Sequence, residues 1–204
     1  RYRISDYFGA NSKRISQSVR TDVLNIAIRE MCRQWDLRLN EVVETFDTVA
    51  AQNSYVLPTL WRGPYELWYL DPATQSGISE VDFLLLDEFD NLYPDPTKTG
   101  KPKHYTVWGQ SLFFGPTPDA VLTMHHYYYA LMADLVNDND HNAFTDQAWE
   151  TVLFKALGDT ARYGIDDARI PVWKARGDEL EMQLVNSDAR AKSMGRRAVG
   201  VEPH

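Results

Sequence analysis

The middle of the chain encodes a tight β-hairpin, which commits the region around it to antiparallel sheet. Residues 104–108 (HYTVW) are β-branched and aromatic, which suits a half-buried, pleated surface. Gly109-Gln110 places glycine first in a two-residue connection, as a type II′ turn requires. Residues 111–115 form the return strand, and the prolines that follow end it because proline cannot donate to a ladder. No catalytic motif occurs between residues 100 and 119.

Further strands are predicted on both sides of this hairpin. Alternating or β-branched patterns occur in residues 41–51, 53–58, 65–70 and 120–131. Residues 80–92 fit a short helix instead, because their apolar side chains recur at helical spacing and acidic residues crowd the first turn. The sequence therefore predicts an antiparallel β-meander over residues 41–131.

Helical patterns occupy the two ends of the chain. An apolar stripe from Ile15 to Trp35 predicts a long helix over residues 13–36. Two later stripes predict a helix pair over residues 144–188, with Gly177 weakening the second helix. The fold class is therefore predicted as α+β: a helical bundle with an inserted sheet.

The terminal segments lack this periodicity. Residues 1–12 are expected to form an extended arm, and residues 189–204 an extended basic tail that a partner would hold in place. With the insertion counted as part of the bundle, residues 1–204 are predicted to form a single domain.

Acidic residues concentrate in the middle of the chain. The net charge is −8, and residues 63–154 hold 14 Asp/Glu against only Lys98, Lys101 and Lys103. Residues 1–62 and 155–204 are nearly balanced, at +2 and +1. Solubility is the ordinary effect of such a charge. An acidic surface also does not bind phosphate backbones non-specifically, which argues against a nucleic-acid-binding role.

The residues that usually carry chemistry do not form a recognisable site. Cys32 lies near the apolar stripe of the first helix and is interpreted as a core residue. His125 and His126 are neighbours on a strand, so their side chains point to opposite faces. Residues 138–142 resemble the start of a calcium loop, but Ala143 and Trp149 stand where glycine and glutamate are needed.

Carboxylates are close together at Asp87, Glu88 and Asp90, the pairing that a glycosidase uses. Among fourteen acids in one block, such proximity is expected by chance. We predict no catalytic residue, no cofactor and no metal ligand. No apolar run approaches membrane-spanning length, so no membrane partner is expected.

Several stretches without chemical function carry a family resemblance. They are residues 32–35 (CRQW), residues 44–50 (ETFDTVA) with Gln52, Tyr55, Leu57 and Pro58, residues 63–66 (GPYE), Tyr93-Pro94-Asp95, residues 100–119, Tyr127-Tyr128-Tyr129, residues 138–144, and Asp166-Asp167. Through them the chain resembles the head-to-tail adaptor proteins of tailed bacteriophages, also called head-completion or connector proteins.

The resemblance implies a structural, non-enzymatic virion protein at the head–tail junction, assembled in the host cytoplasm. Such adaptors are mostly helical with an inserted β-region, and they form rings, commonly of twelve copies, beneath the portal protein. Their C-terminal segments grip the portal, and the other side offers a platform for tail or nozzle proteins. DNA passes through the ring without specific binding.

Two groups of residues are expected to make these contacts. Arg190, Lys192, Arg196 and Arg197 are expected to dock the tail on the portal, and Lys98, Lys101, Lys103 and Trp108 to contact a neighbouring subunit or a tail protein. Two other functions stay open: a carbohydrate- or receptor-binding tail module, and a wall hydrolase that uses two carboxylates.

Overall fold

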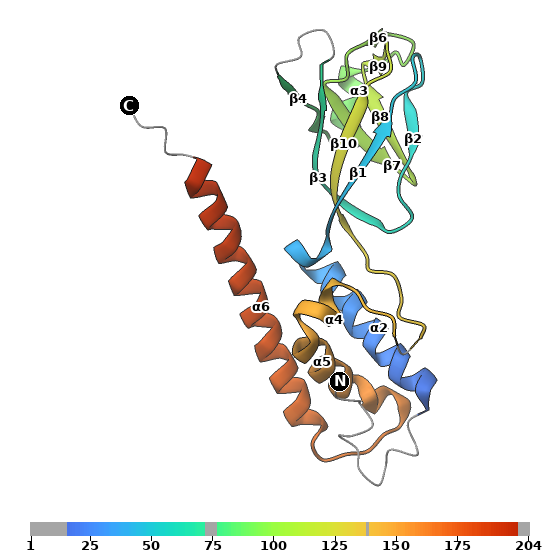
Figure 1. Cartoon of the computed structure of the whole chain (residues 1–204). Helices are drawn as coiled ribbons and strands as arrows, with labels where there is room; N and C mark the ends of the chain where they lie inside the picture. The colour runs from blue at the N-terminus through green and yellow to red at the C-terminus, as the bar shows by residue number, and fades with distance from the viewer. Residues whose placement is uncertain (1–15, 72–76, 138, 200–204) are drawn as a thin grey trace. The chain divides into compact units, whose positions relative to one another are not determined.

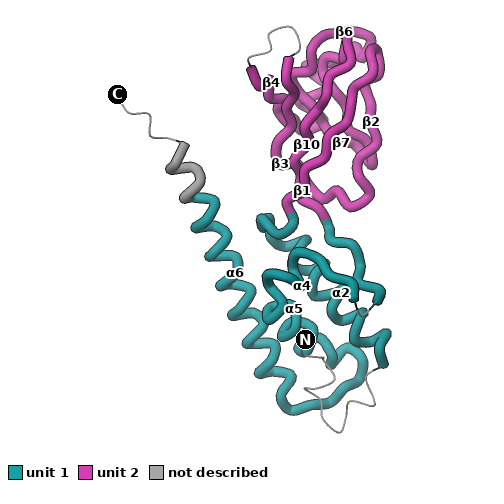
Figure 2. Tube along the Cα trace, viewed as in Figure 1, with its two compact units in different colours: residues 1–40, 131–204 teal, residues 41–130 magenta. Residues whose placement is uncertain are grey.

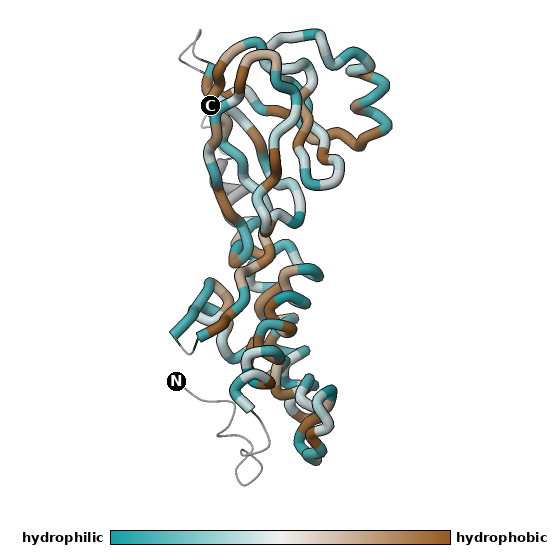
Figure 3. The backbone as a smooth tube through the Cα atoms, turned by 90° about the vertical axis from the view of Figure 1, so that its right-hand side faces the viewer, coloured by the Kyte–Doolittle hydropathy of each residue, from teal (hydrophilic) through white to brown (hydrophobic). Residues whose placement is uncertain are grey.

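The computed structural model describes residues 16–71, 77–137 and 139–199, and the chain forms two compact units. The helical unit comprises residues 1–40 and 131–204, and the β unit comprises Glu41–Ala130 (Figures 1 and 2). Hydrophobic and hydrophilic stretches alternate along the elements of both units (Figure 3). The α+β class predicted from the sequence is therefore confirmed, with helices and mainly antiparallel sheets.

The helical unit is built on three long helices. Its elements are α2 (Gln17–Gln34), η2 (Arg38–Asn40), α4 (Ala143–Gln147), α5 (Trp149–Asp159), η3 (Thr160–Tyr163) and α6 (Ile170–Val199). Helix α2 begins after Ser16, whose hydroxyl accepts a hydrogen bond from the Val19 N–H as an N-cap does. The predicted start at residue 13 lies outside the described residues. Apolar stripes of α2, α5 and α6 meet in one core, around Ala27, Leu157 and Trp173.

A segment whose described residues, 131–137 and 139–142, have no helical structure crosses this bundle. Asn25, which is buried on α2, holds it through both amide atoms. Its Nδ2 donates to the Leu135 carbonyl at 2.9 Å, and its Oδ1 accepts from the Leu135 N–H at 2.8 Å. The buried backbone of this segment is therefore satisfied by a side chain.

The last helix, α6, is longer than the sequence predicted. Residues 189–199 were expected to be an extended tail, but they continue α6 to Val199. Most residues in that stretch are Ala, Arg, Lys and Met, which are strong helix formers, so helical structure does not need an apolar period there. Residues 200–204 lie outside the described residues.

Gly177 lets α6 pack closely against α5. A Cβ at this position would lie 2.9 Å from the backbone nitrogen of Lys155 and 3.1 Å from the carbonyl carbon of Phe154. These are backbone atoms of the facing helix, so they cannot move aside as a flexible side chain can. The glycine that weakens the helix in isolation is therefore required by the helix pair.

The β unit consists mainly of two four-stranded sheets. The first has the order β1 (Glu41–Asp47), β10 (Thr123–Ala130), β3 (Trp61–Leu70) and β4 (Ile78–Glu80). The second has the order β2 (Ser54–Val56), β8 (Ser111–Gly115), β7 (His104–Trp108) and β5 (Asp82–Phe83). Residues from both sheets, among them Leu67, Met124 and Leu112, form one buried core.

The expected hairpin is confirmed. Strands β7 and β8 pair antiparallel from His104↔Gly115 to Trp108↔Ser111, and Gly109 has a φ of 60°. Because Gln110 has no positive φ, the backbone agrees with a type II′ turn.

The strand order differs from the predicted β-meander. Strand β10 lies between β1 and β3, and β1 and β2 belong to different sheets. Two pairs are parallel, β5 with β7 and β6 (Thr99–Gly100) with β9 (Thr117–Pro118). Thr48 stabilises the crossing after β1, because its hydroxyl donates to the Ala120 carbonyl and accepts from the Leu122 N–H, both at 2.9 Å.

The predicted helix over residues 80–92 is shorter in the structure. Helix α3 spans Leu86–Leu92, and residues before it are extended. The Asp82 N–H donates to the Lys103 carbonyl and the Leu84 N–H to the Tyr105 carbonyl, which holds this backbone against β7. Val81 is buried in the core of the β unit, so tertiary packing overrides the helical spacing.

Candidate interaction sites

Residues that carry the family resemblance make internal contacts. Trp35 donates its Nε1–H to Glu181 Oε1 at 3.0 Å, and Lys155 Nζ lies 2.5 Å from Glu181 Oε2. Glu181 is buried, so these two donors compensate a charge that would otherwise be costly. Tyr93 packs on Gly115, where a Cβ would meet its ring, and donates or accepts a 2.7 Å hydrogen bond with His104 Nδ1.

The basic group near the hairpin is not brought together as one site. Lys101 pairs with Asp71, and this hydrogen bond raises the pKa of the Lys101 ammonium group. Lys98 and Lys103 are exposed. Lys103 precedes β7 and Trp108 ends it, so the two side chains lie at opposite ends of the strand. Trp108 therefore belongs to a different surface from the lysines.

Trp108 forms an apolar surface with a strand that the sequence did not associate with it. Ser111 is the register partner of both Trp108 on β7 and Val56 on β2. Directly paired residues share a face of the sheet, so Trp108, Ser111 and Val56 form one row. Trp108 is 64% exposed and Val56 85% exposed. We call these three residues the hairpin-tip row.

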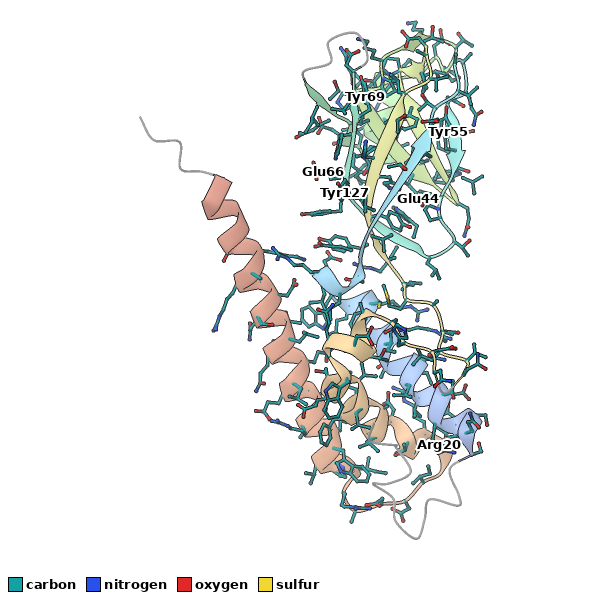
Figure 4. All side chains as sticks on the ribbon, viewed as in Figure 1. Arg20, Glu44, Tyr55, Glu66, Tyr69 and Tyr127 are labelled. Carbon is teal, nitrogen blue, oxygen red and sulfur yellow. The ribbon has the colours of Figure 1, made fainter. Side chains whose placement is uncertain are left out.

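The outer face of the first sheet carries stacked aromatic rings. Trp68 stacks on His125 with ring centroids 3.9 Å apart and planes 8° from parallel, and its centroid lies 6.4 Å from that of Tyr127. Tyr127 and Glu66 are register partners on this face (Figure 4). The alternation of His125 and His126 is confirmed, because His126 points into the core instead.

His126 is one of the residues that line a cleft between the edges of the two sheets. The cleft has a volume of about 360 Å³ and is lined by Glu44, Phe46, Asp47, Tyr55, Val56, Leu57, Pro58, Thr59, Leu112 and His126. His126 is 2% exposed, and within the described part of the chain its buried Nε2 has no hydrogen-bond partner. Burial lowers the pKa of His126 to about 4, so the imidazole is neutral at pH 7.

The C-terminal basic residues divide into two groups. Lys192 donates to the Asp36 carbonyl at 2.5 Å and pairs with Asp188 at 3.1 Å, so it holds α6 against its own unit. Arg190 is exposed. Arg196 and Arg197 lie on α6, but their side chains are outside the described part of the structure.

A model of the SU10 adaptor protein family matches residues 1–199. The chain belongs to the SU10 adaptor family. It is thus a structural protein of the phage neck, a virion component at the head–tail junction that contacts portal and tail proteins. No curated protein matches the chain.

The net negative charge of this SU10 adaptor comes entirely from the β unit. The β unit holds 12 Asp/Glu and 4 Lys/Arg, a net charge of −8, whereas the helical unit holds 17 of each. None of the described helices combines the length and apolar character of a membrane span.

The other candidate sites of the SU10 adaptor make ordinary structural contacts. Asp87, Glu88 and Asp90 are exposed on α3, without the apolar surroundings that a general acid needs. The Asp140 carboxylate accepts hydrogen bonds from the N–H groups of the preceding residues Val136 and Asn137, both at 2.8 Å, and so satisfies backbone donors of its own loop. Asp138 lies outside the described residues.

Proposed function

We propose that this SU10 adaptor chain assembles as a ring, of twelve copies in the family's common form, that joins the portal to the tail and surrounds the DNA passage. The family match over residues 1–199 carries the proposal. The separation of the chain into a neutral helical unit and an acidic β unit supports a division of tasks between them.

The acidic β unit is proposed to face the DNA passage or a tail protein. Carboxylates repel phosphates at short range, and salt screens this effect beyond about 8–10 Å. A wall of that kind lets DNA pass without binding it. The exposed Lys98 and Lys103 and the hairpin-tip row are proposed contacts with a tail protein or a neighbouring subunit, and Lys101 keeps its intrachain partner there.

The end of α6 is proposed to dock on the portal. Contacts of Lys192 and Asp188 hold the preceding part of the helix on its own unit: besides the Lys192–Asp36 bond, the Arg38 N–H donates to Asp188 Oδ1 at 3.1 Å. The residues that follow Ser193 include Arg196 and Arg197 against one acid, Glu202. Together with exposed Arg190, these two arginines supply the charge for docking, and Lys192 acts by anchoring the helix.

A paired substitution tests this docking. Replacing Arg196 and Arg197 by Gln removes two charges but keeps good helix formers, so we expect at least tenfold weaker binding to purified portal. The matched control is Arg20→Gln with Lys174→Gln, two bases of the same unit, which should bind as the wild type does. Removing all residues from 189 onward is a poorer test, because it also deletes the contacts of Lys192.

Equal portal binding by the Arg196/Arg197 variant and the control would contradict docking through this end of α6. Measuring binding by surface plasmon resonance at two salt concentrations adds a second readout. Salt screens the electrostatic part of the binding free energy, so the affinity for portal should decrease with rising salt in the wild type and decrease less in the variant.

A carbohydrate-binding tail module is the second candidate, favoured by the flat Trp68–His125 stack on the outer face of the first sheet. Aromatic rings of that kind suit sugar faces. This function predicts binding to host cell-wall glycans that Trp68→Ala abolishes, and no association with portal. A pull-down with purified peptidoglycan separates the two candidates.

A further inference from the structure

Strand β1 presents an open hydrogen-bonding edge. Its seven residues pair with β10 in continuous register, and within the described ranges β1 pairs with no other strand. The ladder extends to Thr48, whose N–H donates to the Leu122 carbonyl at 2.9 Å. Backbone groups alternate sides along a strand, so Val43, Thr45 and Asp47 direct their N–H and C=O groups away from β10.

This edge is protected only by acidic side chains. Exposed edges are normally protected by charged side chains, especially lysine, or by proline or a β-bulge, which prevent another strand from pairing. The three carboxylates of β1 oppose an acidic strand but not a basic one. Strand β1 (EVVETFD) contains no lysine or proline, and its register with β10 has no shift. Val43 is 55% exposed and Thr45 is also exposed. The edge can therefore accept another strand.

The His126 cleft lies beside the same edge. Glu44 and Phe46 of β1 line it, and they are the register partners of His126 and Met124, which face the core. A strand added next to β1 would direct every second side chain toward this cleft.

We propose that residues 1–8 of a neighbouring copy add to the β1 edge as a β-strand. The proposal rests on the proposed ring, which supplies neighbouring copies. The segment reads RYRISDYF, in which Tyr2, Ile4, Asp6 and Phe8 alternate with Arg1, Arg3, Ser5 and Tyr7. In a strand, the first set shares one face and the arginines share the other.

The first four residues of this segment match the two sides of β1, and Asp6, which shares a face with Tyr2 and Ile4, lies further along the segment. With Tyr2 and Ile4 toward the cleft, ring and aliphatic side chains meet Phe46 and Tyr55, whose centroids are 5.5 Å apart. Arg1 and Arg3 then lie on the outer face with Asp47. Strand β1 carries three carboxylates and no base, so the charges are complementary.

Cross-linking between two single-site variants tests the proposal. Ser5→Cys is made in a tagged chain and Thr45→Cys in an untagged one, since Ser5 shares the arginine face and Thr45 the outer face of β1. Cys32, the one native cysteine, is buried and does not compete. A short bismaleimide added to the mixture, alone or with portal, should join the two chains.

The control replaces Thr45→Cys with Val121→Cys, which is 64% exposed in the same unit but outside β1. We expect at least tenfold less of the mixed product from this control. Adding Val43→Lys to the Thr45→Cys chain places a lysine on the edge, which opposes strand pairing and repels the arginines. This change should reduce the mixed product by a similar factor, whereas Val121→Lys should leave its yield unchanged.

Equal yields from Thr45→Cys and Val121→Cys, with and without portal, would overturn the proposal. These experiments distinguish an error in the proposed strand addition from an error in the proposed ring. If portal complexes form in the proposed stoichiometry while cross-linking is absent, the edge proposal alone is wrong. If cross-linking occurs but no portal complex forms, the ring proposal is wrong.

Discussion

At the scale of single residues, His126 shows how the β unit handles a polar group in its core. The imidazole lies edge-on to Phe46, with centroids 6.4 Å apart and planes at 80°, and 4.9 Å from the ring of Tyr128. Aromatic neighbours supply packing but no charge to stabilise an imidazolium. Burial therefore favours the neutral imidazole and lowers the pKa of His126 to about 4.

The stability of the β unit should consequently depend on pH through His126. The pKa is near 6.5 when unfolded and about 4 when folded, so below pH 6.5 the unfolded chain binds a proton that the folded chain does not. The stability contribution is complete above pH 6.5 and decreases as pH falls toward 4, by about 3 kcal/mol in all. His126→Phe removes this dependence.

Urea unfolding followed by tryptophan fluorescence checks this prediction at neutral pH and at about pH 4.5. Acidification should lower the unfolding free energy of the wild type by about 2–3 kcal/mol more than that of His126→Phe. The same loss in both proteins would show that His126 is not the group responsible.

At the scale of elements, the α5–α6 pair depends on close backbone approach. Gly158 of α5 faces the backbone of Lys174, with 3.1 Å from a Cβ to its Cα, and Gly177 of α6 faces that of Lys155. Each helix thus places a glycine against the other. Without side chains at these points, the buried stripes around Leu157 and Trp173 can meet.

Gly177→Ala should therefore destabilise the helical unit although alanine is the better helix former. The gain in propensity is at most about 1 kcal/mol, whereas overpacking against immovable backbone costs about 1–3 kcal/mol. Ser187→Ala, at an exposed position of the same helix, should be neutral or slightly stabilising. Thermal unfolding by circular dichroism compares the two; a higher melting temperature for Gly177→Ala would contradict the close packing.

Local patterns predicted local structure well in this chain. Gly109 indicated the hairpin turn, and the apolar stripe up to Trp35 indicated α2. The order of strands could not be predicted, because β10 pairs with β1 some eighty residues earlier and nothing local specifies that choice. The helix predicted over residues 80–92 begins later than expected for a related reason: Asp82 and Leu84 bond to the backbone of Lys103 and Tyr105, which come from another part of the sheet.

For the candidate sites, too, the sequence did not predict contacts between residues far apart in the chain. Sequence identified the basic residues but not their partners, which are 30 residues away for Lys101 and 156 for Lys192. It separated His125 from His126 correctly, since strand alternation is a local rule. The hairpin-tip row and the stacked Trp68 and His125 were missed, because each joins strands through the sheet register.

At the scale of the whole molecule, charge and secondary structure follow the same division. The helical unit is neutral in sum and holds the two chain ends, and the β unit carries the net charge. The proposed ring assigns one docking function to each of these two units.

Native mass spectrometry of the 23.5 kDa chain mixed with purified portal tests that central claim most directly. The predicted result is a portal complex that gains many copies of the chain in one step, with twelve as the expected number. Detection of only free chain, or of single copies bound to portal, would contradict the adaptor ring.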